Sequence, residues 1–396
     1  MTLPLSHIKV VEMCQLMAGP MTAMHLADQG ADVIKIESRQ GDAGRRGSTP
    51  GLPETPGMAL RILAFSRNKR SIIVDFTRPS GLEVVRGLVS QADVLVINVR
   101  LGARQRYGLT YEEMAATNPR LVYASITGYG DRGPDANLPS NDNLIQARAG
   151  DLLARQLSNG VPPTVTALYH FDMATALLTF GGIMLALYER ERTGMGQQVE
   201  TNLLQSAVIL QAIQLTRLKS MAQGQAARSD TSSSNYLCAD GKYIYAGVTG
   251  NGWEAICRVL ELDALVKDPR FMTQQLRQQN AAALHDLLSE HFATRPAAEW
   301  EAKLKAEEQN AAVLGEIADL YRDPQVIANN MLTEFDQPGM GTVEGVNAPF
   351  GLLGSSQEQR IRRPVPTLGQ HTQEVLQELG YSLEKIQALR SEGVLG

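Results

Sequence analysis

The sequence predicts an α/β protein with a large domain around a mostly parallel sheet and a smaller α+β domain. Its 396 residues are enough for two or three domains. Hydrophobic residues make up 43% of the chain and charged residues 20%, so a core is available and a disordered chain is excluded. In the first third of the chain, short apolar runs alternate with helix-like stretches, which is typical of βαβ units.

Five short runs rich in β-branched and apolar residues are expected to form the parallel strands. Runs that are apolar on both faces suit a sheet covered by helices on both sides. Helical patterning occupies two of the intervening stretches, Pro20–Gln29 and Pro79–Gln91, and Gly30 and Gly108 fall where helices or turns would end. The expected strands are Ile8–Met13, Ala31–Glu37, Ser71–Phe76, Asp93–Val99 and Leu121–Thr127.

The sequence pattern in the middle of the chain predicts two long helices, after which the amino-acid composition changes. The helices are expected at Asp172–Gly194 and Thr201–Met221, followed by a polar linker at 222–234. A strand at Lys242–Val248 and helices rich in Gln, Ala and Glu should form the smaller domain, and an amphipathic helix is expected at Gln373–Leu389. The expected divisions are residues 1–221 (large domain), 222–330 (small domain) and 331–396 (C-terminal segment).

Composition excludes several classes of function. A net charge of −5 argues against binding nucleic acid. The three cysteines, Cys14, Cys238 and Cys257, are far apart, and the six histidines show no metal-ligand spacing, so we expect neither disulfides nor a metal site. No signal-peptide pattern opens the sequence, and the nearly apolar run Met173–Tyr188 is shorter than a membrane span, so a cytoplasmic protein without a membrane segment is expected.

One glycine motif leaves two interpretations open. Gly128-Tyr-Gly130-Asp-Arg-Gly133 follows an expected strand, as a dinucleotide fingerprint does, but it leads into a proline-containing loop rather than a helix. The first strand–helix turn, Cys14–Pro20, lacks the fingerprint. A turn that shapes another phosphate-rich or thioester pocket fits better than a nicotinamide or flavin site.

Asp172 stands at the expected start of the long apolar helix. One interpretation is a simple N-cap, which aspartate favours. The other is a half-buried carboxylate, kept ionised by the helix dipole, that acts as a nucleophile toward an activated carbonyl. From spacing alone, the N-cap interpretation is favoured.

Basic residues gather near the expected strand ends. In an acidic protein this grouping points to an anionic ligand at the carboxyl edge of the sheet, although a solvated surface explains any single member. The residues are Lys35, Arg39, Arg45, Arg46, Arg67, Lys69, Arg70 and Arg106.

Taken together, an ordered series of short segments resembles the class III coenzyme A transferases, the group of formyl-CoA and carnitine CoA-transferases, with the related α-methylacyl-CoA racemases. The segments run through nearly the whole chain, and their order is more specific than any one of them. They are Ala18–Pro20, Gly30–Glu37, Asn68–Ile72 with Asp75, Ala92–Asn98, Asn118–Leu121, Ile126–Gly130 with Gly133–Pro134, Gln146–Ala147, Arg192–Gln197, Gly369–Thr372 and Leu379–Tyr381.

The resemblance implies a Rossmann-like large domain that binds CoA and an interlocked homodimer, with the C-terminal segment returning to the large domain. It implies transfer of CoA from an acyl-CoA, of which succinyl-CoA is an example, to a small carboxylic acid. Asp172 matches the catalytic aspartate that forms anhydride and CoA-thioester intermediates, which makes the nucleophile interpretation the favoured one. No permanently bound cofactor is implied, because CoA is a substrate.

The resemblance also suggests the other site residues. Asp142 corresponds to a supporting acid, and Asn98 and Arg106 match CoA-contacting positions. Further CoA contacts are expected from proximity at Arg39, Asn68, Lys69 and Arg70. The expected acyl pocket is formed by Leu16, Met17, Asn141 and His170.

Departures from the family pattern bear on the choice of reaction. Asn141 and Asn251 stand where racemases carry histidine and glutamate, and asparagine cannot shuttle a proton as a general base, so transferase is favoured over 2-methylacyl-CoA racemase. Met17 replaces a glutamine of the formyl-CoA branch, and the segment 228–234 lacks that branch's lid glycines. Formate or oxalate is therefore not favoured as the acid. A non-catalytic acyl-CoA binder or a dinucleotide enzyme stays a minor alternative.

Overall fold

The computed structural model describes two compact units. The large unit comprises residues 3–47, 57–153, 164–212, 328–349 and 361–396, and the small unit comprises residues 213–220, 235–247 and 252–327. The expected linker at 222–234, the segment 228–234 and Asn251 lie outside the described residues.

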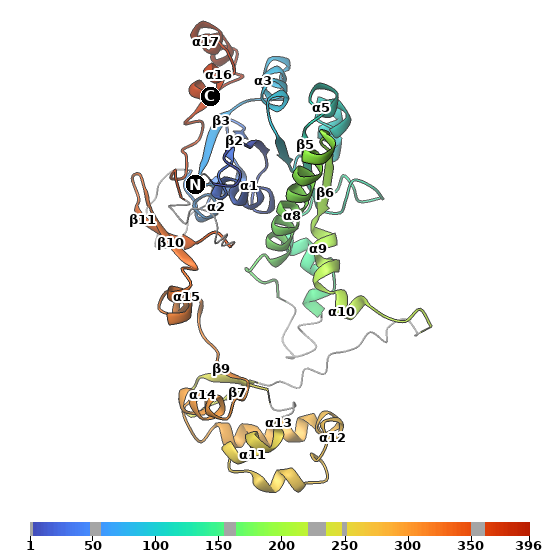
Figure 1. Ribbon diagram of the computed structural model, residues 1–396, viewed down its shortest axis with the longest axis vertical. Coiled ribbons are helices and arrows are strands. Elements are labelled where there is room, and N and C mark those ends of the chain that lie inside the picture. The colour runs from blue at the N-terminus through green and yellow to red at the C-terminus, as the bar shows by residue number, and fades with distance from the viewer. Residues whose placement is uncertain (1–2, 48–56, 154–163, 221–234, 248–251, 350–360) are drawn as a thin grey trace. The chain divides into compact units, whose positions relative to one another are not determined.

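The large unit is built on a six-stranded parallel sheet (Figure 1). Its strand order is β3-β2-β1-β4-β5-β6. Strands β1 to β3 are added toward one edge of the sheet and β4 to β6 toward the other, as in doubly wound folds. Val10 of β1 pairs with Val33 of β2 on one side and Val94 of β4 on the other. The predicted α/β class and five of the strands are confirmed. The strands are β1 (Lys9–Met13), β2 (Asp32–Glu37), β3 (Lys69–Ile73), β4 (Val94–Ile97), β5 (Val122–Thr127) and β6 (Gln198–Asn202).

Alternating side chains of each strand face two separate cores. Val10 packs with α1 (Ala18–Asp28), α8 (His170–Thr193) and α9 (Leu203–Leu210). Its neighbour Val11 packs on the other face, with α3 (Pro79–Ser90) and the C-terminal helices. Both faces are therefore covered, which explains why the strands read as continuous apolar runs. The other elements here are η1 (Ala43–Arg45), α2 (Leu60–Phe65), α4 (Leu101–Tyr107), α5 (Tyr111–Thr117) and α6 (Asp142–Arg148).

Helix α8 is the longest described helix and packs along β5 and β6 (Figure 1). It ends at Gly194, whose φ of +74° allows the left-handed C-cap that glycine adopts without strain. By length and composition alone, α8 is long and apolar enough to cross a membrane, so the expectation that this segment is too short for a membrane span is wrong. Nearly half of its most apolar stretch is buried within the protein.

The expected helix at Thr201–Met221 is wrong in its first part and in its last, because the described helices end at Leu215 and residues 216–220 are not helical. Gln198–Asn202 forms the edge strand β6, with Thr201 paired to Ile126 of β5. The Asn202 side chain then accepts a hydrogen bond from the backbone N–H of Gln205 (2.7 Å) and caps α9. The short helix α10 (Ala212–Leu215) follows.

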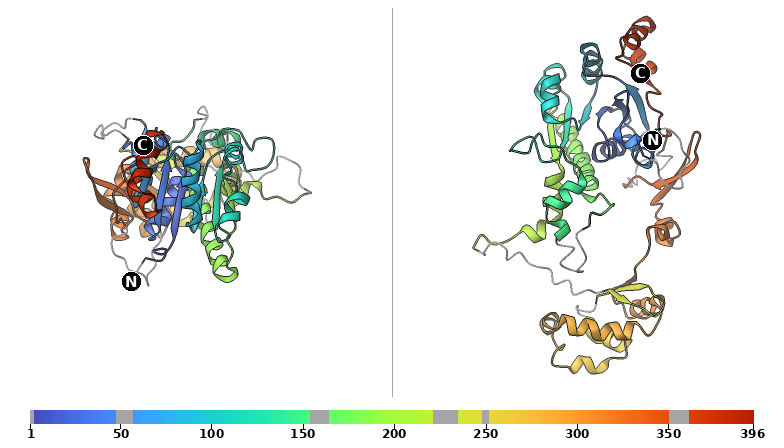
Figure 2. Two further views of the ribbon diagram at one scale, coloured as in Figure 1. Left: turned by 90° about the horizontal axis from the view of Figure 1, so that it is seen from above. Right: turned by 180° about the vertical axis from the view of Figure 1, so that it is seen from behind.

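The last part of the large unit lies against the β3 edge of the sheet (Figure 2). An antiparallel hairpin of β10 (Leu332–Gln337) and β11 (Gly341–Val346) precedes α16 (Thr372–Glu378) and α17 (Leu383–Ser391). The single expected helix at Gln373–Leu389 is thus two helices, separated at Gly380 with a φ of +91°. Near the C-terminus, the Val394 carbonyl accepts a hydrogen bond from the Asp75 N–H (2.8 Å).

The small unit has its own core around Trp253, Phe292 and Trp300. Its three strands, β7 (Asn235–Leu237), β8 (Tyr243–Ala246) and β9 (Ala311–Val313), are antiparallel in the order 7-8-9. Only β8 was expected. The helices are α11 (Trp253–Val259), η2 (Asp263–Lys267), α12 (Gln274–Gln279), α13 (Ala281–Phe292), α14 (Ala297–Ala306) and η3 (Ile317–Tyr321), with α15 (Pro324–Ala328) at its end.

Candidate active site

A cavity of about 510 Å³ opens in the large unit, where the carboxyl ends of β1, β2, β4 and β5 meet. This is the place at which doubly wound sheets bind ligands. The expected site residues Asp172, Asn98, Leu16, Met17 and Asn141 all line it. Other lining residues are Gln15, Ala18, Ser38, Asp42, Phe76, Arg100, Leu101, Thr127, Gly128, Leu138, Ser140 and Leu203.

The loop between β1 and α1 forms one wall of the cavity and is fixed by two side chains. Leu16 has a φ of +69°, a strained value for a leucine, and its N–H donates to Asp42 Oδ1 (2.9 Å). The Asn98 carboxamide holds the preceding residue at both ends, accepting from Gln15 N (3.1 Å) and donating to Gln15 O (2.9 Å). Asn98 therefore has a clear role in shaping the cavity.

Asp172 lies in the first turn of α8, not at its cap. The cap position belongs to Tyr169, with a φ of +46°, so the N-cap interpretation of Asp172 is wrong. The cap is supplied from outside the helix by Asp142, whose Oδ2 accepts from the N–H groups of Phe171 (2.8 Å) and Asp172 (2.9 Å). The Asp172 carboxyl is thereby left to face the cavity.

The environment raises the pKa of Asp172 to about 7. Burial is the main cause, and the charge of Asp142 adds to it, while the Ala18 backbone N–H and the Arg61 guanidinium act in the opposite direction. The expectation that the helix dipole keeps this carboxylate fully ionised is wrong, because burial outweighs the dipole. Perturbed carboxyl groups in a cleft are typical of active sites.

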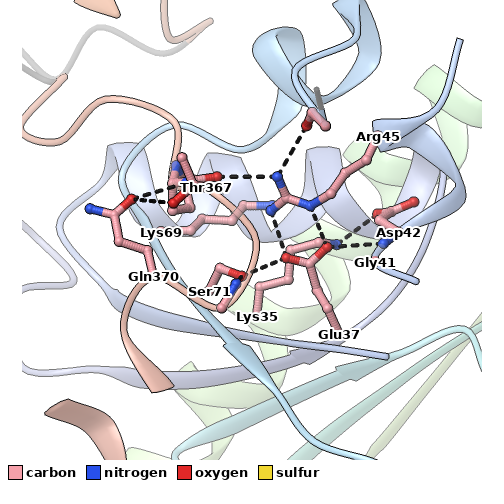
Figure 3. Close-up of polar contacts among 12 residues, drawn as sticks. Lys35, Glu37, Gly41, Asp42, Arg45, Lys69, Ser71, Thr367 and Gln370 are labelled. Atoms are coloured by element: carbon pink, nitrogen blue, oxygen red, sulfur yellow. Dashed lines mark hydrogen bonds and ion pairs between the residues drawn. The ribbon is translucent and has the colours of Figure 1, made fainter. Parts of the chain in front are cut away.

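Buried ion pairs adjoin Asp42, the residue that binds the loop at Leu16, and Figure 3 shows the pair of Arg45 and Glu37 among them. The Lys35 ammonium contacts Glu12 Oε1 (2.7 Å) and Asp42 Oδ2 (2.8 Å), and Lys69 contacts Glu12 Oε2 (2.7 Å). Next to them, Arg45 binds both carboxylate oxygens of Glu37 at 2.6 Å. Because these charges are buried and paired, they support the cavity wall rather than a ligand.

Three of the expected CoA contacts lie at the amino end of β3, away from the cavity. Lys69 is paired as described, and Arg70 binds Asp32 together with Glu374 and Glu378 of α16. Asn68 accepts from the N–H groups of Arg362 and Arg363 and donates to Asp28. These residues therefore do not form the basic cluster that was expected at the carboxyl edge of the sheet. Their ion pairs and hydrogen bonds hold parts of the protein together.

The remaining expected residues lie outside the cavity lining. Arg39 is exposed and donates to the Leu395 carbonyl (2.8 Å), while Arg106 is exposed and lies over the Tyr107 ring. His170 is half-buried, with its Nε2 3.5 Å from Asp151 Oδ2. Asp142 is fully buried and acts on Asp172 through the backbone, as described above.

Sequence reasoning missed one residue of the cavity, Arg100, and had singled out another, Gly128. Arg100 is an exposed cation on the cavity wall, and its position three residues after the end of β4 could have identified it. Gly128 also lines the cavity, and a Cβ atom at this position would lie 2.0 Å from Ser140 Oγ. The glycine motif therefore serves the close approach of the Ser140 loop, in agreement with a turn that shapes a pocket.

Among the described residues, no group of three or more His, Cys, Asp or Glu side chains could hold a metal ion. What the site offers is a half-buried carboxyl with a raised pKa, a nearby backbone N–H and an exposed cation on one cavity wall. Such a set suits covalent acyl transfer to a carboxylate.

The fold and the cavity define an α/β enzyme of the doubly wound kind. Comparison with known families then identifies the chain, which matches the model of CoA-transferase family III over residues 5–372 and belongs to that family. It is therefore a CoA-transferase, an enzyme whose relatives use CoA thioesters as substrates.

Named relatives cover nearly the whole chain. The succinyl-CoA:glutarate CoA-transferase of Mus musculus is 31% identical over 99% of this chain and 90% of its own length. The formyl-CoA:oxalate CoA-transferase of Streptomyces avermitilis is 31% identical over the full length of both. Among solved structures, a CAIB/BAIF family protein from Brucella suis has a TM-score of 0.80 at 31% identity, covering 96% of this chain and 100% of its own.

Proposed function

We propose that this enzyme moves CoA from an acyl-CoA donor, with succinyl-CoA as the first donor to test, to a small carboxylic acid through Asp172. The observation that carries the proposal is the half-buried Asp172 carboxyl that lines the cavity, for which the described residues provide no ion pair and beside which lies the Ala18 N–H. A desolvated carboxylate is a stronger nucleophile than a hydrated one, which suits it for attack on a thioester.

The exchange proceeds in four balanced steps. The Asp172 carboxylate attacks the thioester carbonyl, and the C–S bond breaks to give an aspartyl anhydride and CoA thiolate. The thiolate attacks the aspartyl carbonyl, forming aspartyl-CoA thioester and releasing the donor acid as its carboxylate. The acceptor carboxylate attacks this thioester and releases the thiolate, which then takes the acceptor acyl group and regenerates Asp172. Each tetrahedral oxyanion is stabilised by backbone N–H donors such as that of Ala18.

Arg100 and Asn98 have separate roles in this proposal. Arg100 is a cation on the cavity wall and suits an anionic part of CoA. Asn98 acts by fixing the loop at Gln15, so its contribution is to position the N–H groups that follow. CoA enters and leaves as a substrate, and no resident cofactor is needed for the exchange.

The alternative of a 2-methylacyl-CoA racemase gains no general base from Asn141 or Asp142, the two residues at the start of α6. The Asn141 side chain caps α6 by accepting a hydrogen bond from the Leu144 N–H (3.0 Å). A side-chain amide does not act as a general base near neutral pH. The Asp142 carboxylate is fully engaged with N–H donors.

A transfer assay tests the proposal. The protein with succinyl-CoA and a panel of carboxylic acids should give new acyl-CoA, and Asp172→Ala should abolish it. Glu189→Gln, with a side chain that is 45% exposed near the far end of the same helix, is the matched control and should transfer CoA normally. Hydrogen exchange at the α-carbon of the acyl group in deuterated water, without an acceptor acid, would favour the racemase. Binding of CoA without turnover in either assay would favour a non-catalytic acyl-CoA-binding protein.

We further propose a homodimer in the cytoplasm. Apolar side chains on the outer faces of α8 and α9 are exposed in the large unit, which a second copy of the chain would cover. They are Leu177, Leu178, Leu185, Tyr188, Val208, Ile209 and Leu210. Light scattering should give twice the chain mass, and a monomer in solution or stable adhesion to lipid vesicles would contradict the proposal. The three buried free thiols suit a reducing compartment.

A further inference from the structure

Gln146 of α6 takes no part in the four steps above, and its side chain is completely buried. Its carboxamide makes three hydrogen bonds. The Nε2 group donates to Asp142 Oδ1 and to the Thr166 carbonyl (3.1 Å), while Oε1 accepts from the Thr166 N–H (2.9 Å). A flipped amide would set its oxygen against two acceptors, so these partners fix the Gln146 carboxamide in one orientation.

The bonds of Gln146 fasten the turn that leads into α8. Residues 166–172 form this turn, and Tyr169 within it has a left-handed φ of +46°. Gln146 binds the start of the turn at Thr166. Asp142, four residues earlier on the same side of α6, binds the end of the turn through the Asp172 N–H (2.9 Å). One short helix thus holds both ends of the turn that carries the nucleophile.

Gln146 also fixes the carboxylate of Asp142. The described residues give Asp142 no ion pair, so N–H donors alone hold it: two backbone groups on Oδ2 and the Gln146 amide on Oδ1. Without the Gln146 amide, the carboxylate keeps partners on one oxygen only and can rotate. The apolar contact between the two helices does not depend on these bonds, because Ile145 and Phe171 share one buried core.

We propose that Gln146 is a positioning residue for CoA transfer, which fixes the Asp142 carboxylate and the Thr166 backbone and thereby aims the Asp172 carboxyl at the thioester. The inference rests on the proposed transfer at Asp172 and adds a residue outside the cavity lining on which the rate depends. A reacting group misplaced by about 1 Å can cost a hundredfold in rate. The effect of Gln146 is therefore expected in kcat rather than in KM.

Two substitutions and their combination with Asp142→Asn test the inference. Gln146→Met keeps the length of the side chain but removes all three bonds, and kcat should fall about tenfold to a hundredfold while KM for acyl-CoA stays nearly unchanged. Gln146→Glu loses both donors and sets a second carboxylate against Asp142, so kcat should fall further. With Asp142→Asn added, the amide at position 142 can donate to the carboxylate at position 146 and still accept the Asp172 N–H. The double variant should therefore have a higher kcat than Gln146→Glu alone.

Asn143→Asp is the matched control, because it makes the same change from amide to acid at an exposed position of α6. It should leave kcat unchanged. Hydrogen–deuterium exchange without substrate gives a second readout. The backbone amides of Phe171 and Asp172 should exchange faster in Gln146→Met than in the wild type, and at the wild-type rate in Asn143→Asp.

Three results would overturn the inference. They are a normal kcat in Gln146→Met with only a lower Tm, a raised KM for acyl-CoA with kcat unchanged, and a double variant no faster than Gln146→Glu. Gln146→Met adds no charge and keeps the test open if Gln146→Glu does not fold. A wild type that transfers CoA to no acid would instead contradict the proposed function, and unchanged amide exchange in Gln146→Met would then still show that Gln146 does not hold the first turn of α8.

Discussion

Asp142 acts on Asp172 in two opposing ways. Its Oδ2 accepts the backbone N–H of Asp172 at 2.9 Å and so fixes the first turn of α8, while its negative charge raises the pKa of the Asp172 carboxyl. The same side chain thus positions the nucleophile and keeps it partly protonated near neutral pH. Asp142 is a positioning residue, because it reaches the reacting atoms only through Asp172.

Asp142→Asn should separate these two effects. The carboxamide oxygen still accepts the two N–H groups, whereas the charge is gone, so the pKa of Asp172 should fall. Because the ionised form is the nucleophile, wild-type kcat/KM should rise with pH through about 7 and the variant's rise should occur at lower pH. The bond from the Gln146 amide is lost, at a cost of about 1–3 kcal/mol of stability. A pH–rate profile that does not move would contradict the assigned coupling.

Asp172→Asn should stabilise the protein at alkaline pH. A carboxyl whose pKa rises from 3.8 to about 7 on folding binds more protons in the native state, so the free energy of unfolding falls as pH rises through this range. The loss is on the order of 4 kcal/mol at most by pH 8. The variant should therefore have a higher Tm than the wild type at pH 8 and a smaller advantage at pH 5. Asp286→Asn, at an exposed position, is the control; equal shifts at both pH values would count against the raised pKa.

Substitutions of Asp42 should distinguish positioning of the loop from support of the core. Asp42→Asn keeps an oxygen for the N–H groups of Leu16 and Gly44 but loses its charge beside Lys35, so stability should fall with kcat largely retained. Asp42→Ala removes both functions and should cost about 3–5 kcal/mol and lower kcat as well. Denaturant titration and initial rates measure the two quantities; equal kcat in the two variants would show that the bond to Leu16 does not matter for catalysis.

Gly128→Ala should distort the cavity, because the added Cβ would meet Ser140 Oγ at 2.0 Å. We expect a raised KM for acyl-CoA. The double variant Gly128→Ala with Ser140→Gly removes the clash and should recover most of the lost kcat/KM. If Ser140→Gly does not restore kcat/KM, the contact with Ser140 is not the reason for glycine at position 128, and the backbone conformation is.

Much of the large unit could be predicted from the sequence because its strands are buried on both faces. Short apolar runs such as Val94–Ile97, which alternate with helix-like stretches, indicate such strands. Strand β6, Gln-Val-Glu-Thr-Asn, is a polar edge strand whose identity depends on pairing with β5, so no local pattern indicates it. The N-cap of α8 was misassigned for a similar reason, since its cap is a side chain thirty residues earlier in the chain.

The charged residues show the same limit more sharply. Lys69 and Arg70 belong to a basic segment, but their partners Glu12, Asp32, Glu374 and Glu378 are distant in sequence, so only the folded chain shows that these charges are already paired. Conversely, Arg61 is the one charged residue of the apolar helix Leu60–Phe65, and its hydrogen bond to the distant Tyr169 is known only from the folded chain.

Trapping the covalent intermediate tests the central claim most directly. The wild-type protein is incubated with succinyl-CoA, treated with hydroxylamine or borohydride, digested and analysed by mass spectrometry, with Asp172→Ala as the blank. We predict a modification confined to Asp172 on the peptide that opens α8, formed only when the thioester is present. An unmodified Asp172 together with continued CoA transfer by Asp172→Ala would contradict the account.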